Sequence, residues 1–540
     1  MSPDEPKPKV PVDFYAGWHI SVPDGAVRAP GVRYFVLVIG RTFPNSQPRM
    51  LVPELGSLFQ WPHVEPAGLL CLAPTSIEAS TRDRVGLLLD HTFRLLNFSD
   101  KQCQAEFRRE FGSYWSQLAT RGQDKLRVLS LLKPSDQSRK VIFHFAARQR
   151  RIIVADDFST LSAWRHNVGE ATTPHQTQPA LLLRLQRPWL PDEFPATVAQ
   201  SINGIPDELV RPVLLQHPWS LFVFEAPTDT GPVFAAVLIN SNKLSKLKNG
   251  FRSLQQVPLE NIKRGLASQR VERVAVSRLD PAWVHGRGHS ADLKSLQVRR
   301  VAIIGCGSIG SEIAALLAKA GVGELALLDH DTLNSANLGR HFLGATYLGR
   351  NKAQALAQEL CYRLPHLGIK SAHPKKFEWL SAGELSQLAD MDLIVTAGLD
   401  FDGEAAVNAW RHTLDRPPAY VSTWAEAFCT AGHAVLLYGP DDLMARFEQE
   451  RPTFRLTDWP QEANHLIIEA GCGNVFQPHG AADLLPIIAM AARLVLDAFA
   501  GRVPDSCRRT WFGDREAVTT LQGITRDTFT EINAMRQFRW

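Results

Sequence analysis

A glycine-rich turn between two apolar segments constrains the fold of this chain more than any other feature. The apolar segment Val301–Ile304 leads into Gly305, Gly307 and Gly310, and an alanine-rich segment of helical composition follows. A second apolar segment, Leu325–Leu328, comes soon after it. A short apolar run, a helix and another short apolar run predict a β-α-β unit, the building block of a parallel sheet. We therefore expect an α/β fold here.

The residues around this turn are suited to bind a nucleotide. Glycines let the backbone turn tightly and approach a phosphate at the helix N-terminus, as in Rossmann-like sheets. Asp329, directly after the second strand, is placed to hydrogen-bond ribose hydroxyls. It is followed by Asp331, Asn337, Arg340 and Lys352. Asparagine can orient a phosphate or a ribose, whereas arginine and lysine neutralise a triphosphate and a departing pyrophosphate. Since a dehydrogenase needs no such cations, the sequence predicts ATP rather than NAD.

A further apolar strand places carboxylates near the same site. Leu393–Thr396 is followed by Gly398 and then by Asp400 and Asp402. These acids lie at the carboxyl edge of the predicted sheet, where Mg²⁺ could bridge the phosphates. Either acid fits. Asp400 lies nearer the strand end, so we assign it as the metal ligand, with Asp402 as its substitute.

Four motifs together resemble the ThiF/MoeB/ubiquitin-activating superfamily of adenylating enzymes. The matching residues are Gly305-Cys306-Gly307-Ser308-Ile309-Gly310, Asp329-His330-Asp331, Asn337-Leu338-Gly339-Arg340 and Gly349-Arg350-Asn351-Lys352.

This resemblance implies several roles and an assembly. Arg340 and Lys352 are expected to be catalytic, with ATP and Mg²⁺ as cofactors. An arginine before the sheet binds the ATP phosphates in this superfamily, and Arg287 is the corresponding candidate. Members are usually symmetric dimers, so we expect a homodimer.

The length of the chain indicates more than one domain, because 540 residues exceed what one hydrophobic core usually organises. We predict three domains. Residues 1–122 form a small α+β domain, residues 123–283 a mixed connector, and residues 284–540 the adenylating domain.

The first domain contains one clear strand and an aromatic helix. Tyr34–Gly40 is strand-like in its aromatic and β-branched content. Phe107, Phe111, Trp115 and Leu118 repeat at helical spacing, which predicts a helix that packs its apolar face onto this domain. The aromatic stripe is therefore assigned to the core. The connector shows strand-like runs but no catalytic constellation. We therefore expect it to be a connecting domain that sets the geometry between two active sites.

A cysteine motif in the first domain resembles the active-site stretch of ubiquitin-conjugating enzymes. His63 is followed by Gly68-Leu69-Leu70-Cys71-Leu72, similar to the glycine-x-aliphatic-cysteine-leucine pattern of that family. The resemblance implies that Cys71 accepts an acyl group as a thioester. Val64 follows the histidine, so the family's proline and its oxyanion-stabilising asparagine are missing. The alternative is that Cys71 is a buried strand residue.

A second candidate nucleophile, Cys472, lies between glycines ahead of a long predicted helix, about Ala481 to Ala500. A flexible loop gives access to the thiol, and a nearby helix N-terminus favours the thiolate. The layout resembles the crossover loop of autophagy-type activating enzymes, which implies that Cys472 is catalytic. The alternative is a turn residue without a role. Cys306 and Cys429 are interpreted as structural, and the absence of a CxxC pair argues against a zinc site.

The order of the domains resembles the bacterial activating/conjugating fusion of CBASS antiphage operons. That resemblance implies a relay in which ATP adenylates a C-terminal carboxylate, Cys472 and then Cys71 carry the acyl group, and a target lysine accepts it. The activated partner is expected to be a cGAS/DncV-like nucleotidyltransferase (CD-NTase) or a ubiquitin-like protein. A sulfur-carrier-type adenylyltransferase and a nucleotide-binding scaffold with inert cysteines are the alternatives.

Charge and hydropathy exclude other partners. The formal net charge of +4 is small for this length, so it favours neither nucleic acid nor a membrane surface. No apolar run is long enough for a membrane span, and the first residues do not resemble a signal peptide. We expect a cytoplasmic location.

Overall fold

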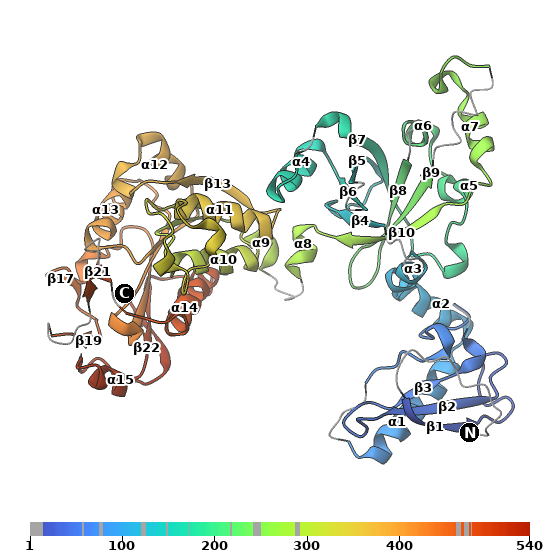
Figure 1. Cartoon of the computed structure of the whole chain (residues 1–540), viewed down its shortest axis with the longest axis horizontal. Coiled ribbons are helices and arrows are strands. Elements are labelled where there is room, and N and C mark those ends of the chain that lie inside the picture. Colours follow the sequence, from blue (N-terminus) through green and yellow to red (C-terminus); the bar gives the residue numbers. More distant parts are fainter. Residues whose placement is uncertain are drawn as a thin grey trace. The chain divides into compact units, whose positions relative to one another are not determined.

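The computed structural model describes residues 14–56, 59–74, 79–119, 126–146, 150–171, 173–215, 219–240, 250–286, 292–460, 466–468, 475–476 and 478–540 (Figure 1). The chain divides into two compact units. Unit 1 contains Met1–Leu161 and Pro174–Arg278, and unit 2 contains Ser162–Thr173 and Leu279–Trp540. The predicted boundary after residue 283 lies close to the end of unit 1, whereas the one after residue 122 falls inside it. The three-domain division stays a prediction.

Unit 1 begins with a small antiparallel sheet covered by a helix. Its strands pair in the order β1 (Phe14–Ser21), β2 (Tyr34–Gly40), β3 (Arg49–Leu51). Helix α1 (Thr81–Leu96) packs on one face, where its leucines share a core with Phe35 and Leu37 of β2. The predicted strand Tyr34–Gly40 is confirmed.

Helices α2 (Asp100–Arg109) and α3 (Phe111–Ala119) follow this sheet. Phe107, Phe111 and Trp115 belong to a core built mainly from the next part of unit 1, and the Trp115 indole N–H donates to the Val274 carbonyl at 3.0 Å. The prediction that this aromatic stripe packs onto the first domain is wrong. Helical spacing identifies the face that is buried, but it does not identify the neighbour that buries it.

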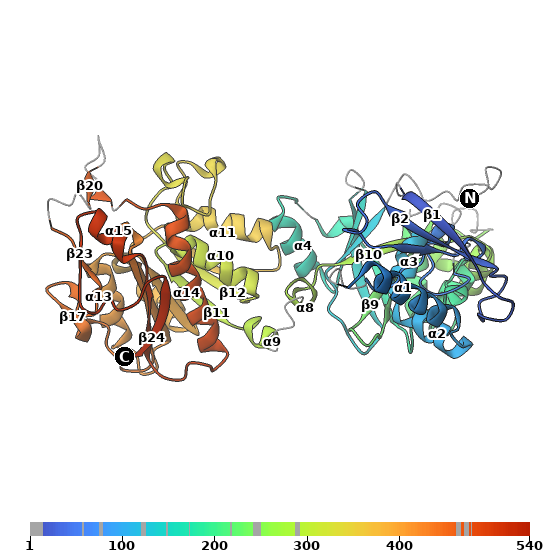
Figure 2. The same ribbon diagram turned by 90° about the horizontal axis from the view of Figure 1, so that it is seen from below.

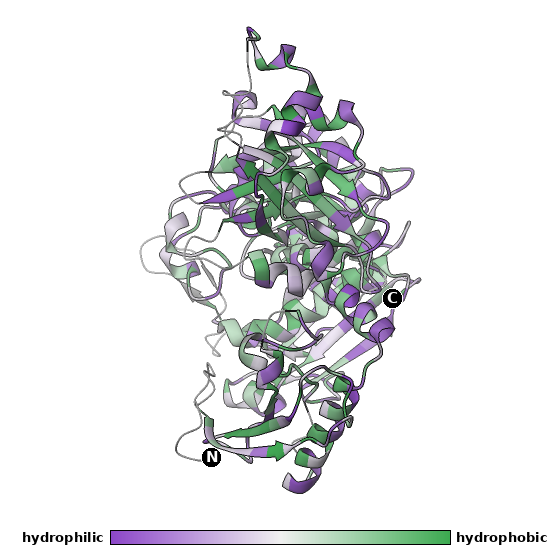
Figure 3. Ribbon diagram, turned by 90° about the vertical axis from the view of Figure 1, so that its right-hand side faces the viewer, coloured by the Kyte–Doolittle hydropathy of each residue, from purple (hydrophilic) through white to green (hydrophobic). Residues whose placement is uncertain are grey.

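The remainder of unit 1 is a closed barrel. The strand order is β10-β4-β6-β5-β7-β8-β9. The bounds are β4 (Arg127–Ser130), β5 (Arg139–Ala146), β6 (Arg151–Ala155), β7 (Thr177–Arg184), β8 (Trp219–Ala226), β9 (Val233–Asn240) and β10 (Glu272–Arg278). Hydrophobic residues concentrate in the strands (Figure 3). They form one cluster among the strands alone and a second with α3, α5 (Val198–Ile202), α6 (Asp207–Leu214) and α7 (Leu259–Leu266).

Unit 2 is built on an eight-stranded sheet in the order β13-β12-β11-β14-β15-β16-β22-β24. The first five are parallel: β11 (Arg300–Ile304), β12 (Glu324–Leu328), β13 (Gly368–His373), β14 (Leu393–Ala397) and β15 (Ala419–Ala425). The last three are antiparallel: β16 (Ala431–Leu437), β22 (Cys507–Phe512) and β24 (Ala534–Arg539). The parallel half has the Rossmann order, with its switch point between β11 and β14.

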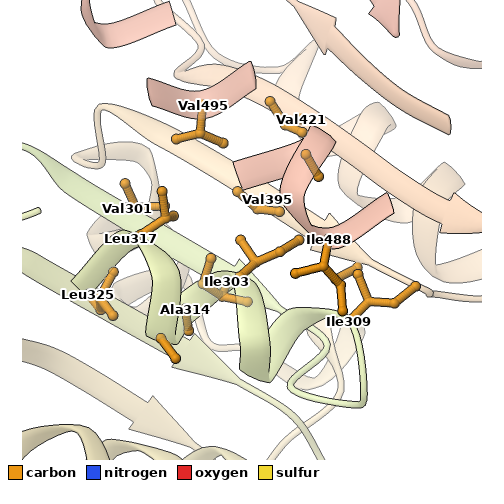
Figure 4. Packing of buried hydrophobic residues seen from close by; sticks show 14 of the residues in the cluster. Val301, Ile303, Ile309, Ala314, Leu317, Leu325, Val395, Val421, Ile488 and Val495 are labelled. Atoms are coloured by element: carbon orange, nitrogen blue, oxygen red, sulfur yellow. The ribbon is translucent and has the colours of Figure 1, made fainter. Parts of the chain in front are cut away.

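Helices cover both faces of this sheet. On one face, α10 (Gly310–Ala320), α11 (Lys352–Arg363) and α14 (Ala481–Phe499) pack against side chains such as Val301, Ile303 and Val395 (Figures 2 and 4). On the other, α12 (Ala382–Ala389) and α13 (Phe401–Arg411) pack against alternate residues of the same strands. Strands buried on both faces explain the continuous apolar runs.

Smaller elements complete the chain. They are α4 (Phe158–Asn167), α8 (Pro281–Val284), α9 (Leu293–Leu296), α15 (Arg515–Thr520) and the strand pairs β17 (Phe447–Glu448) with β18 (Arg451–Pro452), β19 (Thr457–Asp458) with β23 (Ile524–Thr525), and β20 (Ile467–Ile468) with β21 (Val475–Phe476). Within the part of the chain that the structure describes, none of the helices combines the length and apolar character needed to cross a bilayer.

Candidate active site

The glycine turn between β11 and α10 contains two structural glycines and one open position. Gly305 has a φ of +87°, and a Cβ there would lie 2.6 Å from the Ala397 carbonyl oxygen. A Cβ on Gly310 would lie 1.8 Å from the Gly305 carbonyl oxygen. By contrast, a Cβ on Gly307 would meet no atom within 4 Å. Gly305 and Gly310 are therefore required by packing, whereas Gly307 borders the open space that a phosphate would need.

Asp329 is anchored at the end of β12. One carboxylate oxygen accepts from the Cys306 N–H at 2.7 Å and the other from the Asp331 N–H at 2.8 Å. Burial raises the pKa of Asp329 although both hydrogen bonds and the charge of Lys352 oppose the change. These bonds tie the acid to the glycine turn, and its role as a ribose ligand stays a prediction.

Lys352 is buried at the start of α11 and is paired with Asp331. Its Nζ lies 2.9 Å from Asp331 Oδ2, and its backbone N–H donates to the Asp331 carbonyl at 2.9 Å. Asn351 donates from its side chain to the carbonyls of Asp329 and Asp331. Burial raises the pKa of Asp331, but the hydrogen bond and charge of Lys352 outweigh it and lower the value. The structure thus brings together Asp329, Asp331 and Lys352.

The carboxylates near this site offer two places for a cation. Asp329, His330 and Asp331 have ligand-type atoms within 4.8 Å of one another, and they form the one such group of three among the described residues. Asp400 instead begins α13, where one oxygen accepts from the Gly403 N–H at 2.9 Å. Asp402 lies two residues further on, and its side chain is exposed. The choice between Asp400 and Asp402 stays open.

Asn337 and Arg340 lie in the segment between β12 and α11. The Asn337 side-chain oxygen accepts from the Asn334 N–H at 3.1 Å, so it shapes this loop. The sequence did not single out His341. Its Nε2 donates to the Cys306 carbonyl at 2.7 Å, since its Nδ1 accepts from the Leu343 N–H at 3.0 Å. Burial lowers the pKa of His341, so the side chain that donates to the glycine turn is a neutral imidazole.

Cys71 in unit 1 is exposed at the end of a short antiparallel pairing. Val64 and Leu70 form an isolated bridge, and the Cys71 N–H donates to the His63 carbonyl at 2.8 Å. Of the six cysteines that the structure describes, only Cys71 is exposed. The alternative that Cys71 is a buried strand residue is therefore wrong. A cavity of about 270 Å³ borders it, lined also by Arg49, Leu72 and Leu88.

Two family comparisons match separate parts of the chain. Residues 285–450 match the ThiF family, and residues 14–122 match prokaryotic E2 family B. Residues 285–450 thus resemble a ThiF domain and residues 14–122 a prokaryotic E2 domain, and they are called the ThiF domain and the E2 domain below. The predicted resemblance to a bacterial activating/conjugating fusion is confirmed, and so is the predicted α/β class of the ThiF domain.

Individual relatives match only parts of the chain. The ATP-dependent ubiquitin transferase-like protein Cap2 of Pseudomonas aeruginosa is 30% identical over 236 residues, which cover 42% of this chain and 41% of that protein. Ubiquitin-like modifier-activating enzyme 5 of Drosophila virilis is 28% identical over 127 residues, which cover 22% of this chain and 32% of that protein. The chain thus spans less than half the length of these relatives. A crystal structure of E. coli MccB with ATP is 16% identical over 46% of this chain and 65% of that chain, and its TM-score of 0.30 is too low to compare folds.

A cavity of about 420 Å³ adjoins the glycine turn of the ThiF domain. Ser308 and Gly398 line it on the side of the turn, and Trp424 of β15 and Phe447 of β17 line it as well. Glu404 contributes a carboxyl group that accepts hydrogen bonds from Thr396 and Tyr420. Cys429 also lines this cavity, and burial raises the pKa of its thiol to about 12, which suits a structural cysteine.

Two predicted site residues cannot be placed. Arg287 and Cys472 lie outside the described residues. Strands β20 and β21, which flank residues 469–474, pair antiparallel, with Ile467 opposite Phe476.

Proposed function

We propose that this protein activates the C-terminal carboxylate of a partner protein with ATP and conjugates it to a target lysine. The observation that carries the proposal is the buried Lys352, paired with Asp331 at the sheet edge where the glycine turn leaves open space at Gly307. The name of the Pseudomonas relative supports ATP as the nucleotide and a ubiquitin-like transfer.

The first step is adenylation, in which a carboxylate oxygen attacks the α-phosphate and pyrophosphate leaves. A carboxylate is already a nucleophile, so the site needs positioning and charge neutralisation more than a general base. Lys352 and Arg340 are proposed to stabilise the leaving pyrophosphate. Mg²⁺, which prefers carboxylate oxygens, would add positive charge at Asp400 or Asp402. Asp329 is proposed to hold the ribose, and Arg287 to contact the phosphates.

The acyl group then moves through two thioesters. We propose that Cys472 takes it from the adenylate and that Cys71 accepts it from Cys472. The exposure of Cys71 supports this role, because an acceptor thiol must reach both an incoming thioester and a target amine. The match to prokaryotic E2 family B supports it independently.

The partner and the setting follow from resemblance. We propose a CD-NTase or a ubiquitin-like protein as the activated partner, cytoplasmic antiphage defence as the setting, and a homodimer as the assembly. An exposed Cys71 in an E2 domain disfavours the sulfur-carrier and inert-scaffold alternatives.

The test of adenylation is ATP–pyrophosphate exchange in the presence of candidate carrier proteins. Lys352→Ala should abolish exchange because the negative charge of the leaving pyrophosphate is then no longer stabilised by the buried ammonium group. Gly307→Ala should fold, since its methyl group meets no atom, yet should lose exchange because that methyl group enters the phosphate space. Arg340→Ala and Asp400→Ala should also lose exchange.

The matched control is Lys319→Ala, which removes an exposed lysine from α10. It should exchange pyrophosphate as the unaltered protein does. If NADH binds while ATP does not, or if Lys352→Ala keeps full exchange, the adenylation proposal is wrong.

A further inference from the structure

His63 links the Cys71 segment to helix α3. The Cys71 N–H donates to the His63 carbonyl at 2.8 Å, and the His63 N–H donates to the Tyr114 hydroxyl oxygen at 2.8 Å. Because Val64 and Leu70 are antiparallel bridge partners, His63 and Cys71 lie opposite each other on adjacent segments. The backbone of His63 is therefore hydrogen-bonded both to the Cys71 segment and to helix α3.

The His63 imidazole is paired with a carboxylate of helix α2. Its Nε2 lies 2.9 Å from Glu106 Oε2, and Arg109 donates to the same oxygen at 2.6 Å. Burial raises the pKa of Glu106, but the hydrogen bonds from His63 and Arg109 outweigh it and lower the value. Since an ionised carboxylate only accepts hydrogen bonds, Nε2 carries a proton, and a neutral His63 has its lone pair on Nδ1.

Tyr114 holds the backbone of His63 in an unfavourable conformation. His63 has a φ of +58°, a region that side chains other than glycine rarely adopt. The phenol is buried against Phe59 and Phe107, and burial raises its pKa to about 12, so it stays protonated. Strain of this kind persists where the surroundings impose it, and it clusters at functional sites.

The barrel sets the position of Tyr114. Its neighbour Trp115 is 1% exposed, packs against Phe194 with ring centroids 5.2 Å apart, and donates its indole N–H to the Val274 carbonyl of β10. The Cys71 site is thus completed by a helix whose other face belongs to the barrel core.

We propose that His63 and Glu106 form a proton-accepting pair for the lysine that attacks the acyl group on Cys71, with Tyr114 as a positioning residue for His63. This inference rests on the proposed function, because it requires a thioester at Cys71. The pair would accept a proton only from nucleophiles that are protonated at neutral pH, such as primary amines.

The proposed step balances as follows. The lysine ammonium gives one proton to His63 Nδ1, and the amine nitrogen forms a bond to the thioester carbonyl carbon. The C–S bond breaks as the amide forms, Cys71 leaves as a thiolate, and the second ammonium proton goes to that thiolate or to water. Glu106 stabilises the imidazolium that results.

The test separates amine activation from acyl transfer itself. Full-length protein carrying Cys472→Ala is acylated with a glycine-ending peptide supplied as its mercaptoethanesulfonate thioester. Peptide mass spectrometry establishes that the acyl group is on Cys71. Discharge is then followed with free lysine, which needs deprotonation, and with hydroxylamine, which is already unprotonated at neutral pH.

His63→Asn is the first variant, because asparagine tolerates positive φ. It should slow discharge to lysine by on the order of 100-fold, the usual contribution of a general base. Glu106→Gln should slow it roughly tenfold, as expected when a hydrogen bond to a charged partner is lost. Tyr114→Phe should also slow it. All three should discharge to hydroxylamine as the unaltered protein does.

Glu110→Gln is the matched control, since Glu110 Oε1 lies 3.6 Å from Arg109 Nη2 and the His63 ring is paired with Glu106 instead. It should discharge to both nucleophiles normally. Acylation of Cys71 with normal lysine discharge by His63→Asn and Glu106→Gln would overturn this inference alone. Equal loss with both nucleophiles would also overturn it, because that points to general damage. Failure to acylate Cys71 at all would contradict the proposed function.

Discussion

Glu404 is a buried carboxyl group in the wall of the cavity beside the glycine turn. Burial raises its pKa from 4.5 to about 7, even though Tyr420 and Thr396 donate hydrogen bonds to it. Between these two pH values the folded state binds more protons at this group than the unfolded state does. The stability that Glu404 contributes is therefore complete below pH 4.5 and is lost as the pH rises through 7.

Glu404→Gln should remove this pH dependence, because an amide resembles the protonated carboxyl at every pH. Relative to the unaltered protein, the variant should gain stability as the pH rises from 4.5 to 8, by up to about 3 kcal/mol. Thermal unfolding of both proteins across this range measures the gain. A stability difference that stays constant with pH would show that Glu404 is ionised in the folded state throughout.

Helix α3 is the element that joins the two parts of unit 1. Its Trp115 side chain lies in the barrel core, whereas Tyr114 faces the segment of His63. Leu118, on the same helix, is only partly buried against that core. The helix therefore couples the stability of the barrel to the geometry at Cys71.

Trp115→Ala should destabilise unit 1 by about 3–5 kcal/mol, the usual cost of removing a buried aromatic side chain. Leu118→Ala, the matched control, should cost less because Leu118 is only partly buried. Denaturant unfolding of the full chain measures both values. Equal losses would mean that the helix is not anchored through Trp115.

Sequence reasoning found the elements whose signal is local. Two local signals predicted the parallel strands of unit 2. Strands buried on both faces have continuous apolar runs, as in β11, β12 and β14. A turn with positive φ favours glycine, as at Gly305. The closed barrel was not predicted, since its strands pair across long separations, such as β10 with β4. Glu106, Tyr114 and His341 were missed for the same reason: each acts on a residue far away in the chain.

At the scale of the whole molecule, the proposed acyl relay requires two sites on one chain. In this proposal the ThiF domain would supply the nucleotide site at Lys352, and the E2 domain would supply the exposed Cys71. Separate thioesters would keep the acyl group activated between adenylation and its transfer to an amine. The order of the relay then predicts different products when each cysteine is altered.

Cys71→Ala should still load the carrier onto Cys472 through a reductant-labile bond, but it should form no conjugate with lysine. Cys472→Ala should keep pyrophosphate exchange and form no thiol-sensitive adduct with the carrier. Cys306→Ala, which alters a buried cysteine, is the control for folding.

The most direct test of the relay is to incubate the Cys71→Lys variant with ATP, Mg²⁺ and a carrier that supports exchange, and to map the linkage by peptide mass spectrometry. An amine at this position should accept the acyl group as an amide that cannot be passed on. The account predicts a reductant-resistant bond between the carrier's C-terminus and position 71. A linkage at other positions only, or normal conjugation of targets by Cys71→Ala, would contradict it.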